Sequence, residues 1–116
     1  MSDMNNDFIK EKVKSIIEKY KTRDPYKLVK ALDVILVYVS LVDLNGFYQY
    51  AESNHIIYIN NQLDDDKQKY VLAHELAHLF LHKNINYFRL TEKEHNKIEY
   101  EANTFANELL INDIKF

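Results

Sequence analysis

The sequence of 116 residues contains no cysteine. Disulfide bonds are therefore excluded, and any metal ion must be bound by nitrogen and oxygen ligands. Basic residues are not in excess, because the net charge is −3 at pH 7 and no run of lysine and arginine occurs. This composition predicts no direct binding of nucleic acid.

Long apolar segments are also lacking. Residues 2–7 are polar and carry no apolar signal-peptide core, and no apolar run approaches the length of a membrane span. We therefore expect a cytoplasmic protein that does not contact a membrane. The chain length suits one core and one active site, and no repeat or linker divides the sequence, so residues 1–116 are expected to form a single domain.

The most informative feature is His74-Glu75-Leu76-Ala77-His78, an H-E-x-x-H motif within a helix expected at about 66–82. Two histidines at this spacing lie on one helix face, so both imidazoles reach a single ion, while Glu75 flanks the open coordination position. The helix is apolar nearly all round, which predicts that it is buried. Buried imidazoles and a carboxylate need partners, and a metal ion satisfies all three. Two core histidines bonded to carbonyl groups are the alternative.

A third metal ligand is expected from a final helix at about 92–110. On a helical wheel, Glu99 falls within the apolar arc of this helix, whereas Glu101 projects on the charged side. We therefore predict that Glu99 is the ligand and that Glu101 is solvated. Asn103 is expected either to hold a metal-bound imidazole in the correct tautomer or to be an ordinary polar residue. The apolar arc consists of Ile98, Ala102, Phe105, Ala106, Leu109 and Leu110.

Such a site predicts hydrolysis. Zinc with three protein ligands keeps a fourth position for water, and Glu75 is placed to act as the general base. The donor that would stabilise the oxyanion is left open among four side chains. His95, one turn before Glu99, is the first of them to test, although a packed histidine is the simpler interpretation. The others are His55, Tyr58 and Tyr87.

His82 extends the spacing of His74 and His78 by one more turn. Eight residues rise about 12 Å along a helix, which is too far for all three histidines to share one ion. We therefore expect His82 to interact with carbonyl groups at the end of the helix.

The two motifs together resemble the ImmA/IrrE family of metallopeptidases, a group of gluzincin-like zinc proteases. The resemblance rests on the pairing of His74-Glu75-Leu76-Ala77-His78 with Glu99-x-Glu101-Ala102-Asn103-x-Phe105-Ala106-x-Glu108-Leu109-Leu110, and it covers about residues 24–112. It implies that His74, His78 and Glu99 bind zinc and that Glu75 is the catalytic residue. Many relatives continue with Met-Pro and a further C-terminal domain, where this chain reads Ile111-Asn112-Asp113.

The resemblance also implies a substrate. Family members are encoded beside helix-turn-helix repressors of phages, mobile elements or stress operons and cleave them, so we expect a zinc-dependent endopeptidase with such a repressor as its protein substrate. Two alternatives are a zinc-containing binding module that sequesters a regulator without cutting it, and a zinc-stabilised structural domain. Glu75 favours the enzyme, because a purely structural zinc site has no use for a base.

Hydrophobic patterning and turn signals predict an α+β fold. An amphipathic helix is expected at about 7–21, and Asp24-Pro25 should begin a short helix at 26–32. Apolar, β-branched runs predict three strands, joined by a hairpin at Asn45-Gly46 and a turn at Ser53-Asn54. The expected sheet is small and antiparallel and packs against the helices. Its strands are 34–44, 47–52 and 55–60, the last at an exposed edge where a peptide substrate would add as a further strand.

Overall fold

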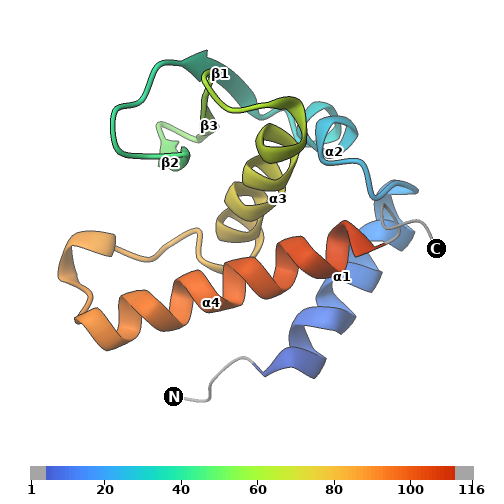
Figure 1. Cartoon of the computed structure of the whole chain (residues 1–116). Coiled ribbons are helices and arrows are strands. Elements are labelled where there is room, and N and C mark those ends of the chain that lie inside the picture. Colours follow the sequence, from blue (N-terminus) through green and yellow to red (C-terminus); the bar gives the residue numbers. More distant parts are fainter. Residues whose placement is uncertain (1–4, 112–116) are drawn as a thin grey trace.

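The computed structural model describes residues 5–111, and it combines helices with a three-stranded sheet in an α+β fold, as predicted (Figure 1). Six of the seven predicted helices and strands agree to within one residue; the first strand ends at Val39 instead of residue 44. Within residues 5–111, no helix is both long and apolar enough to cross a membrane. The elements are α1 (Asn6–Tyr20), α2 (Pro25–Ala31), β1 (Ile35–Val39), β2 (Gly46–Ala51), β3 (Asn54–Asn60), α3 (Asp65–Leu81), the 3-10 turn η1 (Tyr87–Arg89) and α4 (Glu92–Leu109).

Side-chain caps fix where the two longest helices begin. At the start of α3 the carboxylate of Asp64 accepts a hydrogen bond from the backbone N–H of Lys67, at 2.9 Å. At the start of α4, Thr91 and Glu94 form a reciprocal capping box, in which each side chain accepts from the other residue's backbone N–H. A cap of this kind is worth about 1 kcal/mol. The chain therefore determines locally where both site-bearing helices start.

The sheet is mixed, so the prediction of an antiparallel sheet is wrong. The strand order is β1-β3-β2, with β1 parallel and β2 antiparallel to β3. Strand β3, which was expected at an edge, is the central strand, and its residues Ile57 and Ile59 are buried. The two edges of the sheet are β1 and β2.

The error lies in the turn at Asn45-Gly46, which is not a hairpin. After β1 ends at Val39, residues 40–45 cross to the far side of β3, and β2 begins there. The side chain of Asn60 holds this crossing segment in place. Its amide nitrogen lies 3.0 and 3.1 Å from the carbonyl oxygens of Leu41 and Leu44 and donates a hydrogen bond to each. A side chain on β3 thus decides what the local turn signal left ambiguous.

The only hairpin among the described strands turns at Glu52-Ser53. Both residues have positive φ angles, 51° and 66°, which is the backbone of a tight type I′ turn without the asparagine and glycine that favour it. The predicted turn at Ser53-Asn54 was therefore displaced by one residue.

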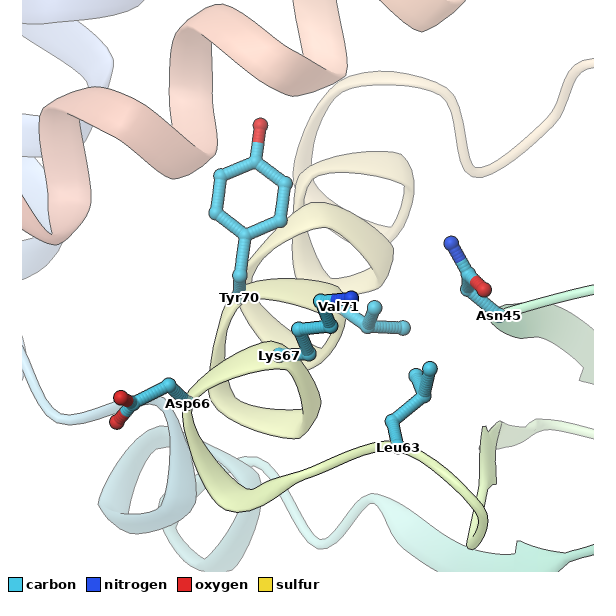
Figure 2. A pocket seen from close by; sticks show the side chains of 6 residues that line it. All are labelled: Asn45, Leu63, Asp66, Lys67, Tyr70 and Val71. Carbon is cyan, nitrogen blue, oxygen red and sulfur yellow. The ribbon is translucent and has the colours of Figure 1, made fainter.

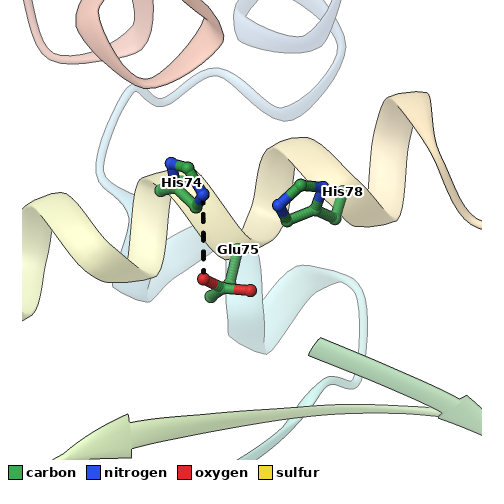
Figure 3. Close-up of side chains that lie close together, drawn as sticks. All are labelled: His74, Glu75 and His78. Carbon is green, nitrogen blue, oxygen red and sulfur yellow. Dashed lines mark ion pairs between the residues drawn. The ribbon is translucent and has the colours of Figure 1, made fainter. Parts of the chain in front are cut away.

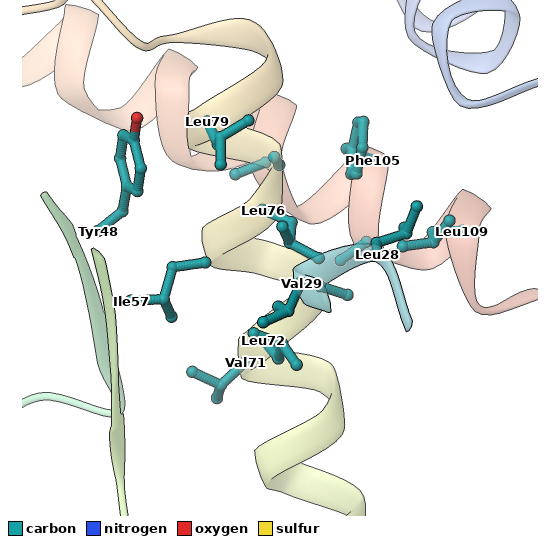
Figure 4. Packing of buried hydrophobic residues seen from close by; sticks show 14 of the residues in the cluster. Leu28, Val29, Tyr48, Ile57, Val71, Leu72, Leu76, Leu79, Phe105 and Leu109 are labelled. Atoms are coloured by element: carbon teal, nitrogen blue, oxygen red, sulfur yellow. The ribbon is translucent and has the colours of Figure 1, made fainter. Parts of the chain in front are cut away.

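Helix α3 occupies the centre of the molecule. It packs against β2 and β3 on one side and against α4 and α2 on others (Figures 1 and 4). Leu72 and Leu76 of α3 and Phe105 of α4 are fully buried in the shared core. Truncating one of these leucines to alanine would cost about 2–5 kcal/mol. This enclosure agrees with the apolar circumference of α3.

Candidate metal centre

Helix α3 brings His74, Glu75 and His78 together. The two imidazole ring centroids are 5.0 Å apart, and donor atoms of all three residues lie within 4.8 Å of one another (Figure 3). Nε2 of His74 is 4.0 Å from Oε2 of Glu75. Glu75 and His78 are buried, whereas His74 keeps partial exposure. The motif therefore forms a compact cluster with one side open to solvent.

Helix α4 adds Glu99 to this cluster. Oε1 of Glu99 is 3.2 Å from Nε2 of His74, and Oε2 is 3.1 Å from Nε2 of His78. The Glu99 carboxylate thus faces the Nε2 atom of each imidazole. Two nitrogens and a carboxylate that converge from two packed helices are a donor set that zinc accepts in three-ligand catalytic sites.

The ionisable groups of the cluster shift one another's pKa values. Hydrogen bonds from His74 and then from His78 hold the pKa of Glu99 far below its ordinary value. Burial lowers the pKa of His74, but its hydrogen bond to Glu99 and the charges of Glu75 and Glu99 outweigh burial, so this pKa is raised above 6.5. Burial raises the pKa of Glu75 above 4.5, in spite of the neighbouring histidines. Glu75 is therefore a stronger base than an ordinary glutamate, which suits proton transfer.

The far nitrogen of His74 is held by Asn103. Nδ1 of His74 is 2.8 Å from Oδ1 of Asn103, and the hydroxyl of Tyr70 donates to the same oxygen at 3.2 Å. An amide oxygen only accepts, so Nδ1 of His74 carries a proton. This contact is the one expected for Asn103, and it leaves Nε2 of His74 as the nitrogen that faces the site.

The far nitrogen of His78 has different partners. Nδ1 of His78 lies 3.0 Å from Nδ1 of His82 and 2.7 Å from the hydroxyl of Tyr87. Nε2 of His82 in turn lies 2.8 Å from Oε1 of Glu101. His82 and Glu101 are 2% and 4% exposed. A chain of three side chains therefore runs from His78 into the protein interior.

Two expectations from the sequence are wrong here. Glu101 is buried, not solvated, and His82 contacts side chains through its ring instead of helix-end carbonyl groups. A helical wheel marks a buried face by its apolar residues, so a buried carboxylate paired with a buried histidine escapes it. The signal that could have found the pair is the repeated four-residue spacing of His78 and His82 together with a second acidic residue beside Glu99.

Of the four candidates for an oxyanion donor, Tyr87 is the one in contact with the cluster. Burial, followed by the charges of Glu99 and Glu75, raises the pKa of Tyr87, so its hydroxyl stays protonated and able to donate. His95 is exposed, with its ring 6.4 Å from that of Tyr87. The other two bond elsewhere: His55 to the hydroxyl of Tyr48, and Tyr58 to Gln49.

A cleft of about 310 Å³ opens beside the cluster. The start of β2 forms one wall, because Gly46 packs so closely on α3 that a Cβ there would lie 2.5 Å from Cγ1 of Val71 and 3.3 Å from Cγ of Glu75. The single glycine of the sequence therefore stands where β2 meets the metal-site helix. The cleft is lined by Asp43, Leu44, Asn45, Gly46, Tyr70, Val71, His74, Glu75, Glu99 and Asn103.

A second cavity, of about 360 Å³, adjoins the cleft toward the start of α3 (Figure 2). It shares Asn45, Tyr70 and Val71 with the cleft and is otherwise lined by Leu63, Asp66 and Lys67. The two hollows follow one another along α3. An extended chain bound at the cluster would find room in this direction.

Comparison with known proteins decides the family. Residues 30–116 match the family model described as the IrrE N-terminal-like domain. The chain belongs to this family. The resemblance inferred from the two motifs is thus confirmed, and the chain is placed among metallopeptidases of the ImmA/IrrE type.

Three relatives are similar over different lengths. The metallopeptidase ImmA of Bacillus subtilis is 34% identical over 110 residues, which cover 90% of this chain and 64% of the relative. The uncharacterized immunity region protein 2 of Bacillus phage phi105 is 38% identical over 109 residues, or 90% of this chain and 69% of the relative. The radiation response metalloprotease IrrE of Deinococcus deserti is 33% identical over 60 residues, which cover 51% of this chain and 21% of the relative. The chain spans about two thirds of the length of the first two relatives.

Proposed function

We propose that this chain is a zinc-dependent endopeptidase that cleaves one particular protein, such as a helix-turn-helix transcriptional repressor of a phage, mobile element or stress operon. The observation that carries the proposal is the meeting of Glu99 with Nε2 of both His74 and His78 beside the buried carboxylate of Glu75. A transcriptional repressor acts in the cytoplasm of a bacterial cell, so we also expect this protein to act there.

In this proposal His74, His78 and Glu99 hold the zinc ion. Because catalytic zinc is usually four-coordinate, three protein ligands would leave one position for water, and the cleft beside the cluster would give water access to it. The bound ion would polarise the scissile carbonyl group and lower the pKa of water. The sequence contains no cysteine that could compete as a ligand.

The remaining steps belong to protein side chains. Glu75 accepts a proton from the attacking water and passes it to the leaving amine, and its raised pKa matches both tasks. Tyr87 donates a hydrogen bond from its hydroxyl group to the oxygen that becomes negatively charged. Asn103 keeps the proton of His74 on Nδ1, so that Nε2 of His74 remains directed at the site.

The substrate is proposed to pair with the free edge of β2. This strand is an edge of the sheet, and it begins at Gly46, in van der Waals contact with α3 beside Glu75. A peptide added there as a further strand would pass the metal centre. The central position of β3 removes the docking edge that the sequence predicted at residues 55–60.

Narrow specificity follows from the same geometry. The cleft of about 310 Å³ and the β2 edge beside it offer few subsites, so recognition of a particular partner must supply much of the positioning that makes a bond reactive. The names of the relatives, an immunity region protein of a phage and a radiation response metalloprotease, agree with a regulatory substrate.

The test is incubation of the zinc-loaded protein with the regulator encoded beside it and, separately, with casein. We expect one or a few cuts in the regulator by mass spectrometry, no cut after chelation of zinc or in Glu75→Gln, and little digestion of casein. Efficient digestion of casein would contradict narrow specificity. Tight binding of the regulator without cleavage would contradict the enzyme and identify a sequestering module.

A further inference from the structure

We propose that His82 and Glu101 form a buried pair of positioning residues that orients His78 for metal binding. Neither residue is a metal ligand in the proposed function; the pair acts through Nδ1 of His78. This inference rests on the proposed role of His78 as a ligand and extends it to two residues for which the catalytic mechanism has no other use.

Burial shows that the pair is built into the core. An imidazole and a carboxylate that are 2% and 4% exposed lose nearly all contact with water, which is costly unless each polar atom has a partner. Every buried side-chain nitrogen and oxygen within residues 5–111 does have one. His82 uses both ring nitrogens, one toward Glu101 at 2.8 Å and one toward His78 at 3.0 Å.

The chemistry of the partners sets the direction of these hydrogen bonds. The carboxylate of Glu101 only accepts, so Nε2 of His82 carries the proton of the neutral ring. Nδ1 of His82 is then an acceptor, and Nδ1 of His78 must donate to it. Without a metal ion, Nε2 of His78 donates to Glu99. A bound metal ion would take the place of that proton, and a His78 that then donates from Nδ1 is neutral and offers the lone pair of Nε2 to the metal ion. The buried pair thus selects the tautomer that binds a metal ion.

The same hydrogen-bond directions leave the hydroxyl proton of Tyr87 unused by His78. The single Nδ1 of His78 is within reach of both His82 and the hydroxyl of Tyr87, which lies 2.7 Å away. When His78 donates from this nitrogen, the Tyr87 hydroxyl finds no acceptor there and keeps its own proton for another partner. The positioning pair and the proposed oxyanion donor are therefore compatible.

The two imidazoles are held in different ways. His74 is oriented by Asn103, an exposed amide, whereas His78 is oriented by a chain of buried groups. A buried, fully bonded network has fewer alternative arrangements than an exposed contact. His78 is therefore the rigid anchor of the centre.

The experiment replaces both members of the pair by apolar groups of similar size, in His82→Phe/Glu101→Leu. Replacing both partners avoids an orphaned buried charge, so the metal-free protein should unfold at a temperature close to that of the wild type. Zinc affinity, measured by competition with a chromophoric chelator, should fall about 10- to 100-fold. Glu101→Met, which keeps the approximate size of the side chain but removes the acceptor for Nε2 of His82, serves as a second variant with a smaller loss of zinc affinity. His55→Phe is the matched control with no loss.

The outcomes separate this inference from the proposed function. Wild-type zinc affinity in a folded double variant would overturn the positioning role and leave a merely structural pair. If the double variant does not fold, Glu101→Met decides: weaker zinc binding supports the role and unchanged binding overturns it. Failure of the wild-type protein to bind zinc would overturn the proposed function itself, together with the inference that depends on it.

Discussion

Oε2 of Glu99 lies 3.1 Å from Nε2 of His78, so a carboxylate of α4 meets an imidazole of α3 across the contact between the two helices. The other oxygen of the same carboxylate lies 3.2 Å from Nε2 of His74. The position of Glu99 therefore depends on how α4 packs against α3, and the first prediction tests its consequence for metal binding.

Glu99→Ala should lower the zinc content markedly, because two imidazoles alone leave the ion without its third protein ligand. Purified protein should contain about one zinc ion per chain in the wild type, measured by elemental analysis after dialysis. Glu92→Gln, a change in the exposed first turn of the same helix, is the control and should retain zinc. Full zinc content in Glu99→Ala would remove Glu99 from the ligand set.

Zinc affinity should fall as the pH is lowered, and the fall should begin above pH 6.5. Zinc binds the neutral imidazole, and the pKa of His74 is raised above 6.5. Protons therefore compete for His74 at a higher pH than for an ordinary histidine. Chelator competition between pH 8 and pH 5.5 would show the trend, and NMR titration of the metal-free protein would show the His74 ring titrating above 6.5. By contrast, burial and the charge of Lys83 lower the pKa of His55, so its ring should titrate below 6.5.

Tyr87→Phe should reduce kcat by about 100-fold or more if Tyr87 donates to the oxyanion. Zinc affinity should stay near the wild-type value, because Nδ1 of His78 keeps His82 as a partner. Cleavage of the cognate regulator would be followed under saturating conditions, with Tyr58→Phe as the control. A fully active Tyr87→Phe would contradict the assignment and make His95 the next residue to test.

Gly46→Ala should destabilise the protein by about 1–3 kcal/mol, the usual effect of overpacking a tight contact. The new Cβ would lie 2.5 Å from Cγ1 of Val71 and 3.0 Å from the carbonyl oxygen of Tyr58, so β2 must move away from α3. Cleavage should decline as well, because β2 borders the cleft. Urea unfolding would measure the change in stability.

A double variant provides the internal check on Gly46. Val71→Ala removes the nearest atom, so Gly46→Ala/Val71→Ala should be more stable than the sum of the two single effects predicts. Strict additivity would show that the contact with Val71 is not the cause. Wild-type stability of Gly46→Ala alone would show that the close approach is not required.

The sequence by itself determined the features that depend on neighbours along the chain. The spacing of His74 and His78 places both imidazoles on one face of any helix they share. The cap at Asp24-Pro25 fixes the start of α2 in the same local way, through a hydrogen bond within one helical turn. The helical phase of Glu99 relative to its apolar neighbours was likewise readable from the sequence.

Only the tertiary structure decided the features that depend on distant partners. The Asn45-Gly46 turn signal was misleading because Asn60, on another strand, fastens the crossing segment and lets β1 pair with β3. Glu101 looked solvated because it falls on the charged side of the helical wheel, but it is buried against His82 at the end of α3. Periodicity reports which face of an element is apolar. Which polar side chains meet within the core follows from packing between elements, and the sequence of one element does not contain that information.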